Sequence, residues 1–262
     1  SIMPISDSPW APTGFGTNTK NVAAILRKDG HHIGYGGCQN PRHDKYEIPW
    51  PLNQTETTEE VELLPIMFPG KEKYGEESFK HWVGGFKPDI VLTHLDFQMF
   101  AHVAGHKQPT QANIPLFTED NKRMLNRQER ADILTKMYKK IKAGVPWKWA
   151  AVIPFDGEPP IPMWQQSLDL MDYKICMSRY GQLVMEKNFE NCENSYYMPH
   201  GVDTKFFKPI LNPTYGDKTL KEIAGDAFIV GCVARNQHRK NIPQLIKGFK
   251  EFVDRNDLKP TD

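Results

Sequence analysis

Four short stretches of almost uninterrupted apolar residues restrict this chain to a small set of folds. They are Asp89–Thr93, Trp149–Ile153, Tyr173–Met177 and Phe228–Val233. Each has the length of a strand, and a strand that is apolar on both faces is typical of a parallel sheet covered on both sides. Segments with helical spacing lie between these stretches. The sequence therefore predicts an α/β protein, a Rossmann-like parallel sheet with helices on both faces.

The helices are indicated by apolar residues that recur every three or four positions. Thr17–Asp29 carries such residues on one side and ends at Gly30, a residue favoured just after a helix. Ser178 can cap the start of a second helix. Ile242–Val253 has an apolar face with charged residues opposite. The basic segment Asn121–Lys142 is interpreted as a helix with one core face, in preference to a surface for an anionic partner.

Irregular stretches divide the chain. Residues 39–60 and 105–120 are rich in polar residues and proline, and we expect them to be surface excursions. A Pro-containing polar stretch at 209–226 is predicted to be a linker. It would join a first domain, 1–208, to the first βα unit of a truncated second domain, 227–262.

Composition excludes several classes of protein. The 262 residues carry a net charge of +1, which gives no general attraction to nucleic acid or to an anionic membrane. The four cysteines are scattered, so free thiols in a reducing compartment are expected and a metal site is not. No stretch approaches the ~20 apolar residues of a membrane span, and no signal peptide is recognisable. We expect a cytoplasmic protein and leave peripheral contact with a membrane open.

Two loops are candidates for binding phosphate. Gly14, Phe15 and Gly16 precede a predicted helix, where glycines and free amide groups allow close approach of an anion. An ordinary strand-to-helix turn explains them equally well. Arg235 and Lys240 follow a predicted strand, and their charges could stabilise a leaving diphosphate. The alternative is a solvated basic turn.

Other candidates lie after predicted strands. His200 precedes a glycine at a tight turn, although a lone histidine is more often structural. Asp156 and Glu158 follow a strand and could position an acceptor hydroxyl or act as a base, unless they form a simple surface turn. His94, also at a strand end, raises the same question, and no third metal ligand accompanies it.

Taken together, these pieces resemble the retaining glycosyltransferases of family 4. The stretch Pro199–Asp203 with Phe207 and Pro209 is similar to the family signature P-[HN]-G-V-D…F-x-P. The segment from Arg235 to Phe249 is similar to the segment of the family that binds the donor phosphates. Two shorter matches, Ser178–Gly181 and Pro88–Val91, occur in the order of the family.

The resemblance implies a GT-B fold, in which two Rossmann-like domains face each other across the active site. Arg235 and Lys240 would hold the diphosphate of a nucleotide-sugar donor such as a UDP- or GDP-sugar, and the Gly14–Gly16 loop would approach the donor. His200 would lie near the cleft. Asp156 stands where the family commonly has histidine, which puts the acceptor chemistry in question. The E-x7-E region of the family is absent, so transfer is expected only in a longer chain.

The predicted function is therefore transfer of a hexose, with retention of configuration, to a glycan, lipid or other acceptor. No separate cofactor is expected. A non-catalytic binding module derived from the GT-B fold stays open as an alternative. So does a related sugar-nucleotide epimerase or a DNA-modifying transferase, although near-neutral charge disfavours a nucleic-acid partner.

Overall fold

The computed structural model separates the chain into two units, Ser1–Phe206 and Phe207–Asp262. The residues that the structure describes are 1–39, 45–49, 58–68, 70–107, 123, 124, 126, 128, 129, 132, 133, 146–192, 195–225, 227–234 and 236–258.

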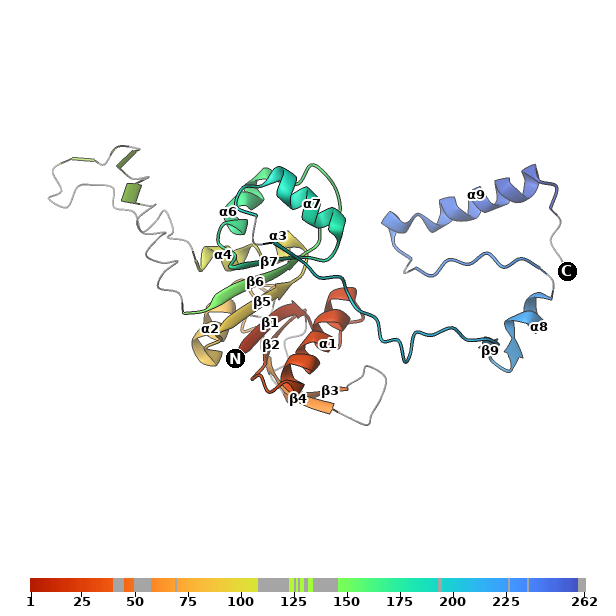
Figure 1. The fold of residues 1–262 in the computed structure, drawn as a ribbon, viewed down its shortest axis with the longest axis horizontal. Helices are drawn as coiled ribbons and strands as arrows, with labels where there is room; N and C mark the ends of the chain where they lie inside the picture. Colours follow the sequence, from red (N-terminus) through yellow and green to blue (C-terminus); the bar gives the residue numbers. More distant parts are fainter. Residues whose placement is uncertain are drawn as a thin grey trace. The chain divides into compact units, whose positions relative to one another are not determined.

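The first unit is built on one sheet of eight strands (Figure 1). Seven strands are parallel, in the order β4-β2-β1-β5-β6-β7-β8, and β3 adds antiparallel to β4 at one edge. Their bounds are β1 Ile2–Asp7, β2 Gly34–Cys38, β3 Lys45–Pro49, β4 Thr58–Leu64, β5 Ile90–His94, β6 Lys148–Ile153, β7 Tyr173–Cys176 and β8 Ser195–Tyr197. The predicted Rossmann-like parallel sheet is confirmed.

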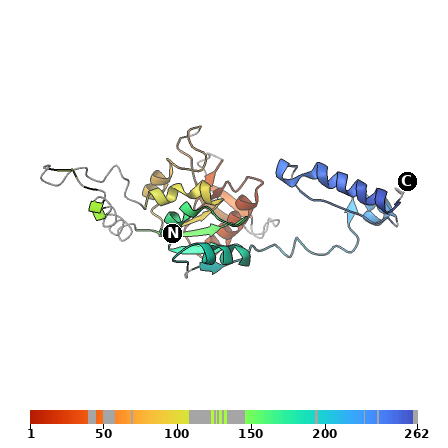
Figure 2. The ribbon, with the colours of Figure 1, turned by 90° about the horizontal axis from the view of Figure 1, so that it is seen from above.

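Helices connect these strands and cover the sheet. α1 packs along β1 and β4, and α7 packs along β7 and β8 (Figures 1 and 2). The helices of this unit are α1 Gly14–Lys28, α2 Phe79–Phe86, α3 Phe97–Phe100, α4 His102–Gly105, the 3-10 turn η2 Pro162–Trp164, α6 Gln165–Leu168 and α7 Arg179–Asn188. Ser178 caps α7, as predicted, because its hydroxyl accepts a hydrogen bond from the amide of Gly181 at 2.9 Å.

Two buried clusters hold the helices to the sheet. The larger one combines side chains from the strands with those of the helices after β4, β5, β6 and β7; Trp149 and Phe100 are fully buried in it. The smaller one joins Ala23 and Ala24 of α1 to Tyr35 of β2 and neighbouring apolar residues. Alternate residues of one strand point to opposite faces, so a central strand serves both clusters.

Two predictions of irregular structure are only partly correct. Residues 39–60 were expected to form a surface excursion, but β3 lies inside this range and β4 begins in it. β4 alternates charged and apolar residues, with Val61 and Leu63 buried, because it lies near the edge of the sheet. Residues 108–120 of the second expected excursion lie outside the described residues, as do most of Asn121–Lys142.

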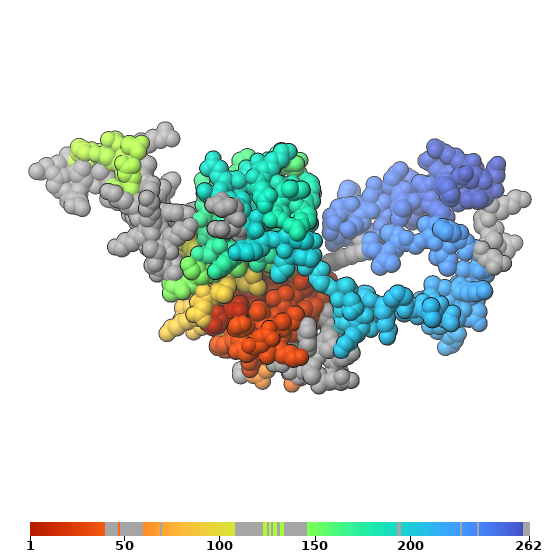
Figure 3. Space-filling model, in the orientation of Figure 1, coloured from red at the N-terminus to blue at the C-terminus, as the bar shows by residue number. Residues whose placement is uncertain are grey.

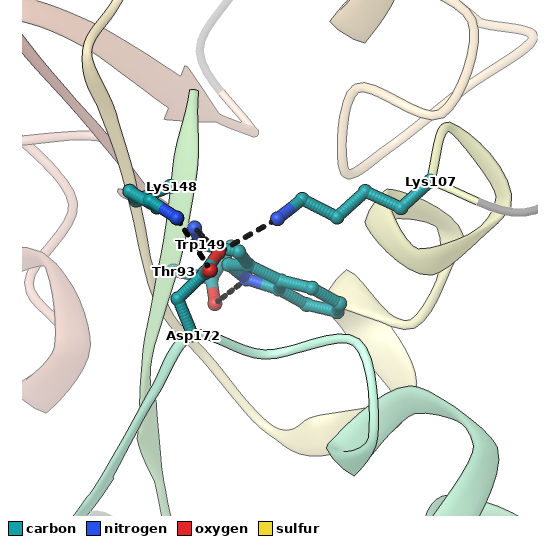
Figure 4. Close-up of polar contacts among 5 residues, drawn as sticks. All are labelled: Thr93, Lys107, Lys148, Trp149 and Asp172. Atoms are coloured by element: carbon teal, nitrogen blue, oxygen red, sulfur yellow. Dashed lines mark hydrogen bonds and ion pairs between the residues drawn. The ribbon is translucent and has the colours of Figure 1, made fainter. Parts of the chain in front are cut away.

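Charged side chains, of which Lys107 is buried, join β6 to β7 at the amino end of these strands (Figure 4). Asp172 accepts hydrogen bonds from the Lys107 ammonium and from the backbone amide of Trp149, both at 2.8 Å. Lys148 approaches the same carboxylate at 3.3 Å from the other side (Figure 4). Lys107 is 3% exposed, and its ammonium lies 4.6 Å from the centre of the Trp147 ring. These contacts satisfy a cation that would otherwise be costly to bury.

The second unit contains a short hairpin and two helices. Its elements are β9 Thr214–Tyr215, β10 Lys218–Thr219, α8 Leu220–Ala224, the 3-10 turn η3 His238–Lys240 and α9 Ile242–Arg255. Its segments leave open space between them (Figure 3), and none of its described side chains is buried. The strand predicted at Phe228–Val233 is wrong: these residues have no regular structure, and no neighbouring strand among the described residues pairs with their backbone.

Candidate functional site

The sheet of the first unit reverses its direction of growth between β1 and β5. From β1 the chain proceeds to β2 on one side, whereas β5 and the later strands lie on the other side. In doubly wound sheets the ends of two such strands border a crevice, and ligands bind there. The carboxyl ends of these strands are Asp7 and His94, and this edge is therefore the expected place for a ligand site.

The Gly14–Gly16 loop forms the first turn of α1, the helix that follows β1 after a loop of residues 8–13. The Thr13 hydroxyl accepts a hydrogen bond from the amide of Gly16 at 3.1 Å and caps the helix. A side chain on Gly16 would meet the carbonyl oxygen of Ser8 at 2.6 Å, so packing within the protein already requires this glycine. Gly14 has open space around it. Of the two predicted glycines, only Gly14 leaves room for close approach of a ligand.

Three predicted site residues from distant parts of the sequence meet at this edge. The rings of Phe15 and His94 have centres 5.3 Å apart, and the rings of His94 and His200 have centres 5.0 Å apart, both edge to face. His94 is 3% exposed, whereas His200, which follows β8, is exposed. The sheet therefore brings one buried and one accessible histidine together beside the start of α1.

A groove of about 240 Å³ runs from these histidines along the face of the sheet beside α1. We call it the His94 groove. Its lining is mostly aliphatic and consists of Ile2, Asn18, Thr19, Val22, Leu26, Ile90, Leu92, His94, Val152, Ile175, Met198 and His200.

His94 is held by hydroxyl groups of β1 and α1. Its Nδ1 lies 2.7 Å from Thr19 Oγ1, and its carbonyl oxygen accepts a hydrogen bond from Ser6 at 2.8 Å. Burial, with a smaller contribution from nearby His200, lowers the pKa of His94 from 6.5 to about 4. The ring is therefore neutral at pH 7. It can accept or donate a hydrogen bond but carries no charge to attract phosphate.

A second cavity, of about 340 Å³, opens at the end of β6. We call it the Asp156 pocket. Asp156 and Glu158 line it together with Asp96, and one wall is formed by Phe97 and Trp164, whose rings are stacked 4.3 Å apart. Phe97 is buried, so the half-buried Trp164 is the ring of this pair that a ligand can contact. An aromatic ring beside carboxylates suits a molecule that has both apolar faces and hydroxyl groups.

The two predicted carboxylates of this pocket differ in their partners. Glu158 is bound to α7: its Oε1 accepts hydrogen bonds from Lys187 Nζ at 2.7 Å and from Asn188 Nδ2 at 3.1 Å. Asp156 is exposed and has no hydrogen-bond or ion-pair partner among the described residues. Asp156 is thus the carboxylate available to a ligand, and Glu158 holds the loop in place.

The predicted phosphate-binding pair belongs to the second unit. Arg235 lies outside the described residues. Lys240 ends η3, directly before α9, and is exposed. Their joint action on a diphosphate stays a prediction.

Sequence reasoning missed the polar residues of β1 and α1 that lie near His94. Ser6 and Thr19 are buried, and their hydroxyl groups lie 3.0 Å apart. Asp7 is also buried, and its carboxylate accepts a hydrogen bond from Gln39 at 2.6 Å. The run Ser6-Asp7-Ser8 at the end of a strand was the available signal, because polar residues are unusual in a buried strand.

The fold defines the molecule as an α/β protein with a Rossmann-like parallel sheet. Polar residues gather at the carboxyl ends of β1 and β5, where the sheet reverses its direction of growth. Comparison with protein-family models and with curated proteins gave no match. Within the described parts of the chain, no three histidine, cysteine or acidic side chains are grouped to hold a metal ion. No helix in those parts has the length and apolar character needed to span a membrane.

Proposed function

We propose that this chain is the acceptor-side part of a retaining glycosyltransferase of the GT-B type, with the start of its nucleotide-sugar-binding domain. It would take part in transfer of a hexose from a nucleotide sugar to an acceptor hydroxyl. The parallel sheet supports this proposal at the level of the fold only, because many unrelated functions use such sheets. The sequence resemblance supplies the reaction class.

The meeting of Phe15, His94 and His200 carries the proposal. These residues are 79 and 106 positions apart along the chain, and the sheet gathers them at the edge where α/β folds bind ligands. The sequence singled out each of them separately. Their grouping is expected if the signature around His200 marks a ligand site.

The Asp156 pocket supports a role in binding the acceptor. An ionised carboxylate accepts hydrogen bonds from hydroxyl groups, and the half-buried ring of Trp164, which packs on buried Phe97, offers an apolar surface to a sugar ring. We assign Asp156 to the acceptor hydroxyl and His200 to the reacting sugar. Arg235 and Lys240 are assigned to the diphosphate, whose charge increases as the glycosidic bond breaks.

A thermal-shift screen tests the proposal. We expect UDP-glucose or GDP-mannose to raise the melting temperature of a chain in which the second domain is complete, since a ligand at about 100 times its Kd stabilises the native state by about 2.7 kcal/mol. Arg235→Ala and Lys240→Ala should remove the shift. Lys28→Ala, at the end of α1, is the matched control and should keep it. The proposal fails if none of a panel of nucleotide sugars changes the melting temperature.

A non-catalytic glycan-binding module is the second candidate. The Asp156 pocket favours it, because aromatic and acidic groups suited to a sugar lie wholly within the first unit. Such a module would bind methyl glycosides without any nucleotide, and Asp156→Asn would weaken that binding. Binding of glycosides together with a complete lack of response to nucleotide sugars would favour this candidate over the transferase.

A further inference from the structure

The buried imidazole of His94 has one nitrogen that no group of the described residues satisfies. Nδ1 contacts Thr19, whereas Nε2 is buried and has no hydrogen-bond partner among the described residues. His94 lines the His94 groove, and neither Asn18 nor His200, which line it as well, bonds to this nitrogen. A buried polar atom without a partner is uncommon in folded proteins and calls for an explanation.

Counting hydroxyl hydrogens shows which nitrogen carries the proton. The Ser6 hydroxyl donates its one hydrogen to the carbonyl oxygen of His94, since a carbonyl can only accept. The contact between Ser6 and Thr19 must then use the hydrogen of Thr19. Thr19 has no second hydrogen to give, so at its 2.7 Å contact with Nδ1 the ring nitrogen donates. Nδ1 is therefore protonated, and in the neutral ring Nε2 is an acceptor.

The geometry points to His94 Nε2 as a fixed hydrogen-bond acceptor for a hydroxyl group of the ligand, bound where the groove meets the carboxyl edge of the sheet. An acceptor nitrogen repels phosphate and carboxylate oxygens, which also carry lone pairs, so this position selects a neutral donor. Two kinds of ligand could supply the hydroxyl, a sugar or an alcohol with an apolar body. The inference deepens the proposed function, because it names the ligand group, a hydroxyl, that His94 Nε2 recognises.

Thr19 is the positioning residue in this arrangement. It holds Nδ1 as the donor and so leaves Nε2 free to accept, although Thr19 itself need not touch the ligand. Thr19→Ser keeps the hydroxyl and should preserve the tautomer. Thr19→Val has nearly the same shape but removes the acceptor, so we expect a mixture of the two neutral tautomers. Nitrogen-15 NMR of the histidine ring separates these outcomes, and a merely structural role for Thr19 would not change the tautomer.

The same spectra test binding when the 262-residue chain is titrated with methyl α-D-glucopyranoside, hexan-1-ol and inorganic phosphate. We expect one of the two alcohols to shift the Nε2 resonance, which identifies the source of the hydroxyl, and phosphate to leave it unchanged. His94→Asn can keep a donor near the Nδ1 position, but its shorter side chain has no acceptor atom at the Nε2 position. It should weaken binding of that alcohol about three- to tenfold, as expected for one lost hydrogen bond.

The inference is overturned if Nε2 is the protonated nitrogen in the wild-type chain, if phosphate alone shifts it, or if neither alcohol does. None of the ligands in these titrations is a nucleotide. Binding of an alcohol without binding of any nucleotide sugar would therefore defeat the proposed transferase and leave the role of His94 standing. A response to nucleotide sugars together with a protonated Nε2 would do the reverse.

Discussion

Gly14 and Gly16 are two positions apart in the same turn, but their surroundings differ. A methyl group on Gly16 would press on the carbonyl oxygens of Ser8 and Ala11, at 2.6 and 3.1 Å, whereas nothing lies within 4 Å of one on Gly14. We predict that Gly16→Ala lowers the free energy of unfolding by about 1–3 kcal/mol, the usual cost of overpacking. Urea denaturation with linear extrapolation measures this.

The matched variant is Gly14→Ala. It should leave stability unchanged or raise it by up to about 1 kcal/mol, because alanine favours helices and restricts the unfolded chain. Equal losses for the two variants would contradict the packing described around Gly16. If Gly14→Ala instead impairs ligand binding while the fold stays stable, the ligand occupies the open space beside Gly14.

His94 links stability to pH. Its pKa is about 4 in the folded protein and 6.5 in the unfolded chain, so between these values the unfolded state binds the extra proton. The free energy of unfolding should therefore fall as pH decreases from about 6.5 to about 4, by up to about 3 kcal/mol from this residue. Above pH 6.5 this contribution is constant.

His94→Asn provides the comparison for this pH dependence. Burial also lowers the pKa values of His102 and His106, and both residues titrate in the variant as in the wild type. The difference between the two pH profiles thus reports His94 together with its neighbour His200, whose pKa is also lowered by burial and whose ring contacts His94. Superimposable slopes between pH 4 and 6.5 would show that the ring of His94 takes up its proton as readily in the folded protein as in the unfolded chain.

At the scale of elements, the sequence predicted three of the strands inside the sheet, whereas β1 and β2, which are also buried, were not among the predicted strands. β5, β6 and β7 lie inside the sheet, so their apolar runs are uninterrupted and were recognised within a residue or two. β4 was missed because glutamates alternate with its buried residues. Phe228–Val233 has the composition of a strand but no partner among the described residues, and pairing is a tertiary property that composition cannot supply.

The candidate site shows the same division. Phe15, His94 and His200 were each found from their place after a strand or before a helix, because local patterns mark such positions. Their contact could not be predicted without the strand order, which sets β5 beside β1. Ser6 and Thr19 were missed for a related reason. Their role depends on hydrogen bonds between groups 13 and 75 residues apart.

The charged contact between Lys107 and Asp172, at the start of β6 and β7, can be tested by mutation. Asp172 has a lowered pKa: burial acts to raise it, and the hydrogen bonds from Lys107 and from the Trp149 amide outweigh that effect. Asp172→Asn leaves the Lys107 ammonium buried beside a neutral group. We expect a loss of about 2–4 kcal/mol in the free energy of unfolding, as for other buried pairs that lose one partner.

Two further variants make this test specific. The double variant Lys107→Met/Asp172→Asn removes both charges and should recover part of the loss, because no unpaired charge stays buried. Lys148→Met breaks an exposed pair with the same carboxylate and should cost less than about 1 kcal/mol. A double variant as unstable as the sum of its single changes would rule out coupling between Lys107 and Asp172.

At the scale of the whole molecule, the two units differ in what can hold them folded. Both buried clusters consist entirely of residues from Ser1–Phe206. In the second unit α9 carries Leu245, Ile246, Phe249 and Phe252, all exposed. A helix of about this length is marginal in water without packing of its apolar face. We predict that a fragment of residues 1–206 folds by itself and that a fragment of residues 207–262 does not.

Circular dichroism on the two fragments and on the 262-residue chain measures this difference. Fragment 1–206 should melt in one cooperative transition within a few degrees of the chain, because the buried apolar surface that stabilises the sheet is retained. Fragment 207–262 should lose its signal gradually with temperature. A sharp transition in the second fragment would show that α9 packs within its own unit, and a large drop in the melting temperature of the first fragment would show that residues after Phe206 help to stabilise the sheet.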